Sequence, residues 1–173
     1  MIQLRFISAF ALVLFIASCS NNSEQQMGLI TENAMVVSAR KEASAIGADL
    51  MKKGGNAFDS MVATEMALAV TFPFAGNLAG GGFMVYRLAN GAVGSIDYRE
   101  KAPLQASEDM YLDEEGNVIP GMSTTGAMAI GVPGTVDGIL QVHEKFGTLP
   151  LEEILSPVIA LAKKGFVILS YGF

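Results

Sequence analysis

The alternation of apolar and polar residues between positions 41 and 53 predicts an amphipathic helix. Apolar or small residues recur there at intervals of three and four, which places them on one helix face: Ala43, Ile46, Gly47, Leu50 and Met51. Lys52 and Lys53 complement the negative end of the helix dipole, and Gly54 suits the left-handed conformation that ends many helices. Just before this helix, the short apolar run at 35–39 is typical of a strand.

A second helix is predicted to begin after Asn56. Asparagine is a preferred N-cap residue, and Asp59 follows three positions later. The helix should be buried because it is apolar on nearly every side: Met61, Val62, Ala63, Met66, Ala67 and Leu68. Pro73 closes it, since a proline cannot continue the helical hydrogen bonds.

Two apolar segments at 83–88 and 92–98 are predicted to be strands. They flank Asn90-Gly91, a pair that favours a tight type I′ turn, so the two strands should form a hairpin. Three consecutive glycines, 80–82, precede the first strand, and Arg99 follows the second.

The remainder of the chain is predicted to contain a turn at 113–117 and two more helices. One helix starts near Pro133 and ends at Gly147, and another lies within 149–166, where Pro157 either kinks it or divides it in two. The order is then strand, helix, helix, hairpin, loop, helix, helix. Because strands and helices do not alternate regularly, the pattern argues against a doubly wound parallel sheet and favours an α+β fold, with helices stacked over an antiparallel sheet.

The N-terminus has the features of a secretion signal. Arg5 supplies a positive charge, and 6–17 is apolar except for one serine, which is short for a membrane span but suits a signal-peptide core. The run ends in IASC at 16–19, which resembles a bacterial lipobox, in which the cysteine becomes a lipidated N-terminus. The alternative is a cleaved signal with an incidental cysteine.

We therefore expect 1–18 to be a lipoprotein signal peptide and Cys19 to carry the lipid. Acyl chains would hold the protein at a membrane of the bacterial cell envelope, facing the periplasm or the exterior. The polar stretch at 20–28 has no periodicity and indicates a flexible tether, which we assign to 19–33. The folded domain is then 34–173.

Composition and charge narrow the classes of function. Of the 173 residues, 51% are hydrophobic and 16% charged, as in a globular protein. The formal net charge of −6 argues against a nucleic-acid partner, because phosphate binding requires clustered Lys and Arg. Cys19 is the only cysteine, so we expect no disulfide, thiol nucleophile or cysteine zinc site in the domain.

Two motifs could indicate phosphate binding or nucleophilic catalysis, but their sequence context favours neither. The glycines at 80–82 lack the Gly-Lys-Ser/Thr ending of a phosphate loop and lead into a strand, so we expect a tight turn where backbone packs against backbone. Thr124 and Thr125 are poor nucleophiles without an adjacent base or a free α-amine. The only histidine, His143, is the one route to a Thr-His pair, and the alternative is two loop hydroxyls and a surface histidine.

Arg99 has two interpretations. With Asp97 and Glu100 close in sequence, it can form a structural ion pair. Its planar guanidinium also suits bidentate recognition of a substrate carboxylate.

Several separated segments resemble the N-terminal part of the large subunit of γ-glutamyltranspeptidases. They are KKGGNAFDSMVATEMALAVTFPFAGNLAGGGFMVYR, IDYREKAP, GVPGTVDGILQVHEKFGTLP and LAKKGF, in the family's order between about residues 35 and 166. The resemblance implies an αββα sandwich of the N-terminal-nucleophile hydrolase type. It also implies a precursor that cuts itself, so that a new N-terminal threonine attacks the γ-glutamyl amide of glutathione or a related compound. The γ-glutamyl group then passes to water, an amino acid or a peptide, without a metal or organic cofactor.

Of the family's site residues, the resemblance carries over only Arg99, in DYREKAP, as the group that binds the α-carboxylate of the γ-glutamyl substrate. The nucleophile, which opens a Thr-Thr-His type motif, has no match, because Thr124-Thr125 precedes a glycine and comes far too early. The remaining groups belong to a small subunit from the same precursor, so we expect this chain alone to be inactive. The alternatives are a non-catalytic, membrane-anchored lipoprotein that binds small amino acids or peptides, or an inactive pseudogene product.

Overall fold

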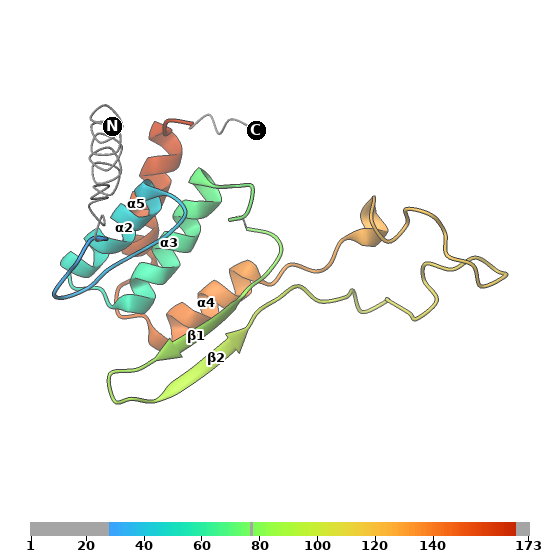
Figure 1. Ribbon diagram of the computed structural model, residues 1–173, viewed down its shortest axis with the longest axis horizontal. Helices are drawn as coiled ribbons and strands as arrows, with labels where there is room; N and C mark the ends of the chain where they lie inside the picture. Colours follow the sequence, from blue (N-terminus) through green and yellow to red (C-terminus); the bar gives the residue numbers. More distant parts are fainter. Residues whose placement is uncertain (1–27, 77, 169–173) are drawn as a thin grey trace, which may run out of the picture. The chain divides into compact units, whose positions relative to one another are not determined.

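The structure, a computed structural model, describes residues 28–76 and 78–168 (Figure 1). The chain divides into two units, Met1–Asn33 and Ala34–Phe173, and every helix and strand of the described residues lies in the second. The predicted signal peptide, Cys19 and most of the predicted tether lie outside the described residues. No helix of the described part has the length and apolar character needed to cross a membrane.

Four α-helices form where the apolar periodicity predicts them. They are α2 (Lys41–Lys52), α3 (Ala57–Thr71), α4 (Thr135–Phe146) and α5 (Leu151–Lys164). The central helix is α3, which contacts the other three (Figure 1). Pro157 lies inside α5, so the helix is not divided in two.

The predicted ends of α2 and the predicted start of α3 are confirmed. Gly54 follows α2 with a φ of +100°, the left-handed conformation expected of it. The Asn56 side chain accepts hydrogen bonds from the backbone N–H groups of Phe58 (2.8 Å) and Asp59 (3.0 Å). In return, Asp59 Oδ2 accepts from the Asn56 backbone N–H at 2.8 Å, which completes a capping box.

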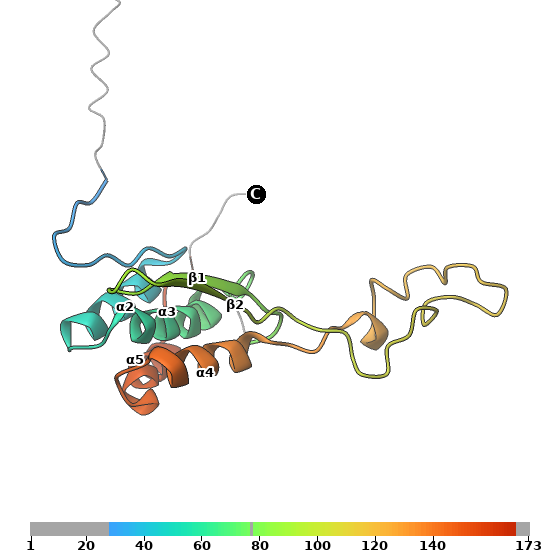
Figure 2. The ribbon, with the colours of Figure 1, turned by 90° about the horizontal axis from the view of Figure 1, so that it is seen from below.

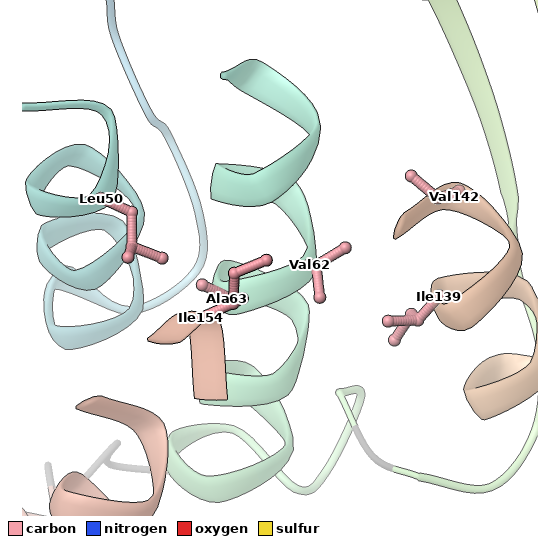
Figure 3. Packing of buried hydrophobic residues seen from close by; sticks show 6 residues of the cluster. All are labelled: Leu50, Val62, Ala63, Ile139, Val142 and Ile154. Carbon is pink, nitrogen blue, oxygen red and sulfur yellow. The ribbon is translucent and has the colours of Figure 1, made fainter. Parts of the chain in front are cut away.

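The core lies between the four helices, and α3 contributes to it on more than one side (Figure 3). Six buried side chains form the main cluster: Leu50, Val62, Ala63, Ile139, Val142 and Ile154. Gly47 lets α2 approach α3 closely, because a Cβ at Gly47 would lie 2.7 Å from Ser60 Oγ and would overlap Thr64. The prediction that the second helix is buried is confirmed.

The predicted hairpin is present as β1 (Phe83–Arg87) and β2 (Val93–Asp97), antiparallel, with Phe83 opposite Asp97. It lies over α3 and α4 (Figure 2). On the face toward the helices, Met84 and Ile96 pack on the core cluster. The other face is exposed and mixed in character: it carries Phe83 (71%), Val85 (79%) and Val93 (73%) beside the polar Arg87, Ser95 and Asp97.

The turn of the hairpin differs from the predicted type I′. A type I′ turn needs a positive φ at both central residues, here Asn90 and Gly91. Gly91 has one (+87°), but Asn90 does not, because every positive φ in the described chain belongs to a glycine. The Asn90 side chain instead accepts a hydrogen bond from the Ala92 N–H at 3.0 Å. This local bond stabilises a three-residue connection that Leu88 closes, by donating to the Ala92 carbonyl at 2.7 Å.

The strand predicted at 35–39 is wrong. Those residues pair with no other segment of the described chain, whose only sheet is the β1–β2 hairpin. Its apolar Met35 and Val37 are 48% and 82% exposed. The apolar pattern marked a segment suited to a sheet, but a strand exists only where another strand completes its hydrogen bonds.

Between β2 and α4, residues 101–133 leave the hairpin and return (Figure 1). Backbone hydrogen bonds between Lys101 and Val132, 2.8 and 3.1 Å long, close the base of this excursion. The turn predicted at 113–117 is confirmed, since the Asp113 N–H donates to the Asn117 carbonyl at 2.9 Å. The 3-10 helix η1 (Ala127–Ala129) precedes the return. The described fold is therefore α+β, as predicted, while the αββα sandwich stays a prediction.

Candidate functional site

The glycine run at 80–82 forms the predicted close backbone contact beneath Arg99. Gly80 has a φ of +67°. A Cβ at Gly81 would lie 2.5 Å from the Glu100 backbone nitrogen, and one at Gly82 would lie 2.8 Å from the Tyr98 ring. A strand follows the run, so these glycines do not open a helix as the glycines of a phosphate loop do. The sequence-based interpretation of this motif is confirmed.

The start of α4 also packs closely against Tyr98. The Gly134 N–H donates to the Gly80 carbonyl at 2.7 Å. A Cβ at Gly134 would overlap the Tyr98 carbonyl oxygen, and a Cβ at Gly138 would overlap the Tyr98 ring. We call Gly82, Gly134 and Gly138 the Tyr98 socket. It fixes the backbone of the residue immediately before Arg99.

Sequence reasoning missed the Tyr98 socket. The signal was present, because Gly134 and Gly138 lie four residues apart, a spacing that places two positions on the same helix face. The spacing did not lead to a prediction, because the neighbouring sequence does not indicate which distant side chain packs against such a glycine face. Tyr98 is half-buried, and burial first, with the nearby charge of Glu65 second, raises the pKa of its hydroxyl.

Glu65 in α3 lies close enough to Tyr98 for its charge to raise the pKa of the tyrosine hydroxyl. Its side chain is half-buried, and burial raises its pKa, because the charged form loses hydration there. No described residue forms a salt bridge with it.

Arg99 forms a planar, two-point ion pair with Asp97. Its Nε donates to Asp97 Oδ1 at 3.1 Å and its Nη2 donates to Oδ2 at 2.9 Å, while the Arg99 backbone N–H also donates to Oδ1 at 3.1 Å. The side-chain hydrogen bonds from Arg99, then its backbone hydrogen bond, lower the pKa of Asp97 to about 2, and the same side-chain contact raises the pKa of Arg99. Both groups therefore stay charged through the neutral range.

This ion pair does not hold the fold together. It joins residues only two positions apart, and the side chains of Arg99 and Asp97 remain 64% and 60% exposed. An exposed local pair contributes little to stability and links no distant elements. Its effect is to orient the guanidinium, which stays accessible to a ligand from solvent.

The second candidate constellation is not assembled. Thr124 and Thr125 are exposed, and Thr124 Oγ1 donates to the Gly121 carbonyl at 3.2 Å. His143 is half-buried in α4, where its Nε2 donates to the Leu149 carbonyl at 2.9 Å. No hydrogen bond joins His143 to either threonine in the described chain. These groups therefore form no activated nucleophile.

No metal-binding cluster of three or more His, Cys, Asp or Glu side chains occurs within 28–76 and 78–168. The chemistry that the described site offers is an accessible guanidinium on a rigid support, which suits recognition of a carboxylate. An α+β domain with an accessible, oriented arginine at a strand end is the class of protein that the fold and site define.

Comparison with known proteins gives the family. The family model described as "Gamma-glutamyltranspeptidase" matches residues 43–171, and the chain belongs to this family. It is 55% identical over 137 residues to a "Glutathione hydrolase proenzyme" of Pseudomonas sp. (strain A14), a match that covers 79% of this chain and 24% of that protein. The "Glutathione hydrolase proenzyme" of Escherichia coli (strain K12) is 47% identical over 137 residues, with the same coverage, 79% and 24%.

A solved structure agrees with the sequence comparison. The Helicobacter pylori γ-glutamyltranspeptidase is similar with a TM-score of 0.75 and 46% identity, over 80% of this chain and 40% of that one. This confirms the resemblance stated from the sequence motifs. The chain spans about a quarter (24%) of the length of the curated relatives it matches.

Proposed function

We propose that this chain is the N-terminal part of the large subunit of a γ-glutamyltransferase or glutathione hydrolase precursor, and that Arg99 binds the α-carboxylate of the γ-glutamyl substrate. The single observation that supports this role is the exposed guanidinium, aligned by Asp97 at the end of a hairpin that packs on the core. A guanidinium in fixed orientation binds a carboxylate through two parallel charge-assisted hydrogen bonds.

The proposed reaction needs residues that the described chain does not supply. A threonine exposed by self-cleavage of the precursor attacks the γ-glutamyl amide, and the acyl-enzyme passes its γ-glutamyl group to water, an amino acid or a peptide. We place that threonine, the oxyanion donors and the α-amine ligands in the small subunit. The helices and hairpin then contribute to an αββα sandwich, and the chemistry uses no metal or organic cofactor.

We further propose that the mature protein starts at Cys19 and is anchored by lipid in the bacterial cell envelope. The support is the IASC motif at 16–19 after an apolar run. Such a location would place the enzyme beside γ-glutamyl compounds outside the cytoplasm.

The decisive experiment uses a full-length chimera in which this domain replaces the segment it matches in the Pseudomonas sp. (strain A14) proenzyme. Arg99→Ala should lower kcat/KM roughly ten- to hundredfold or more for γ-glutamyl substrates with a free α-carboxylate. The loss should be small for analogues whose α-carboxylate is amidated. Arg99→Lys keeps the charge without the fork, so it should recover only part of the activity.

Arg87→Ala is the matched control. Arg87 is an exposed arginine at the end of β1, so its removal deletes the same charge from the same hairpin but away from the glycine turn. Arg87→Ala should leave kcat/KM unchanged for both the free and the amidated substrate. Two results would contradict the proposed function. One is that Arg99→Ala lowers kcat/KM equally for substrates with a free and with an amidated α-carboxylate. The other is that the chimera matures but turns over neither kind of substrate.

A further inference from the structure

The geometry of the Arg99–Asp97 pair divides the guanidinium into a used and an unused edge. Asp97 accepts from Nε and Nη2, which lie along one side of the planar group. A guanidinium has five N–H donors, so Nη1 and the second hydrogen of Nη2 form another edge, at the tip of the side chain. No described residue accepts a hydrogen bond from Nη1.

We infer that Asp97 is a positioning residue, which holds Arg99 by its side edge so that the tip edge is presented to the α-carboxylate of the γ-glutamyl substrate. This inference rests on the proposed function, because it concerns how the same arginine meets its ligand. It adds a second residue to the site, one that touches no substrate and acts through Arg99.

The argument starts from the freedom of an arginine side chain. A free arginine at an exposed strand end samples many rotamers, and a ligand that fixes it must oppose that lost entropy. Asp97 removes much of this freedom before any ligand arrives, because its Oδ1 accepts from both the backbone N–H and the Nε of Arg99. One carboxylate oxygen thus holds both the backbone and the Nε of Arg99, and the Tyr98 socket fixes the backbone between the two residues.

The opposite role for Asp97 is a competitor that occupies the arginine and repels an incoming carboxylate. The geometry favours positioning, because the carboxylate lies along the side edge and leaves the tip edge open. The two roles differ in sign. Removing a positioning residue raises KM, whereas removing a competitor lowers it.

The test uses the same chimera and a free-carboxylate γ-glutamyl anilide. Asp97→Ala should raise KM about three- to tenfold and leave kcat within about twofold, because it releases Arg99 without touching the reacting atoms. Asp97→Asn keeps one acceptor oxygen for the Arg99 backbone N–H and should restore about half of the loss. Neither variant should change the use of the amidated analogue.

Asp49→Ala is the matched control, since Asp49 is an exposed carboxylate paired with Lys52 at 2.8 Å in α2, far from Arg99 in the sequence. It should leave KM unchanged. In an Arg99→Ala background, Asp97→Ala should add no further loss, because there is no arginine left to position.

The outcomes separate this inference from the proposed function. If Arg99→Ala impairs the free-carboxylate substrate but Asp97→Ala leaves KM unchanged or lowers it, the positioning role is overturned and the clamp stands. A fall of kcat and melting temperature with no change in KM would show a structural role instead, which also overturns the inference. If Arg99→Ala has no effect, the proposed function fails and the inference fails with it.

Discussion

Replacing Asp59 should lower the stability of the fold more than replacing any exposed acidic residue. Its side chain is fully buried, and its two oxygens accept four hydrogen bonds. One comes from the Asn56 N–H (2.8 Å), at the start of α3. The others come from the connection between α4 and α5: the Thr148 hydroxyl (2.6 Å), the Thr148 N–H (2.9 Å) and the Leu149 N–H (3.3 Å). A single carboxylate therefore joins three helices.

The size of the effect follows from these contacts. Hydrogen bonds to a charged group contribute about 1.5–3 kcal/mol each, and they are not additive. Removing the carboxylate leaves its donors buried without acceptors, and an unsatisfied buried donor costs about 1–3 kcal/mol. With four donors affected, we expect Asp59→Ala to lower the free energy of unfolding by about 3–5 kcal/mol. Asp59→Asn should lower the free energy of unfolding by less, because the amide keeps one acceptor oxygen. It should still destabilise the fold, because the amide NH2 then faces other hydrogen-bond donors.

The assay is chemical unfolding of the purified chain, followed by circular dichroism as a function of pH. Burial tends to raise the pKa of Asp59, but the hydrogen bonds from Thr148, Asn56 and Leu149 outweigh it and lower the pKa below 3.8. The ionised group therefore stabilises the fold fully above pH 3.8, and this contribution is lost as the pH falls through the lower folded pKa. The gap between wild type and Asp59→Asn should shrink in that acidic window.

The matched control is Asp49→Ala, which removes an exposed carboxylate of α2 and should leave the unfolding midpoint unchanged. If Asp59→Ala unfolds at the same denaturant concentration as wild type, the network adds no net stability. If the gap between wild type and Asp59→Asn does not change below pH 3.8, the pKa argument is wrong.

Further predictions concern other parts of the chain. Burial raises the pKa of Glu65 above 4.5, so its charge costs stability at neutral pH; Glu65→Gln should raise the melting temperature near pH 7 and lose that advantage below pH 4.5. Gly134→Ala should lower the free energy of unfolding by about 1–3 kcal/mol and raise KM in the chimera, because its Cβ overlaps the Tyr98 carbonyl. Gly116→Ala, with a positive φ but open space, should cost about 1 kcal/mol and leave KM unchanged. Cys19→Ala should abolish acyl labelling and membrane association, and persistence of both would refute the lipid anchor. The purified 173-residue chain should not turn over a γ-glutamyl anilide, and turnover would implicate its own hydroxyls.

The helices were predictable because their signals are local. The Asn56 cap, the Gly54 stop and the apolar stripe of α2 each depend on residues within a few positions of one another. The hairpin was found for the same reason. Its turn type was not, because the Asn90 side chain bonds to the Ala92 N–H in preference to a left-handed backbone.

The long-range contacts were not predictable from one sequence. Asp59 was expected only near the start of a helix, and its bonds to Thr148 and Leu149 span 89 and 90 positions. The Tyr98 socket likewise joins a strand end to a helix that begins 37 positions later, at Thr135 (135 − 98 = 37). The failed strand at 35–39 has the same origin, since its pattern says that it suits a sheet but cannot supply a neighbouring strand.

Arg99 combines both situations. Its motif marked it as a candidate, but sequence alone left an ion pair and a carboxylate site as competing interpretations. The structure contains the ion pair, yet the pair is local and exposed, so it cannot act as a tie between elements. A contact that adds little stability but fixes the direction of five donors is better understood as preparation for a ligand. The two interpretations are therefore compatible: under the proposed function, the ion pair orients the arginine that binds the substrate carboxylate.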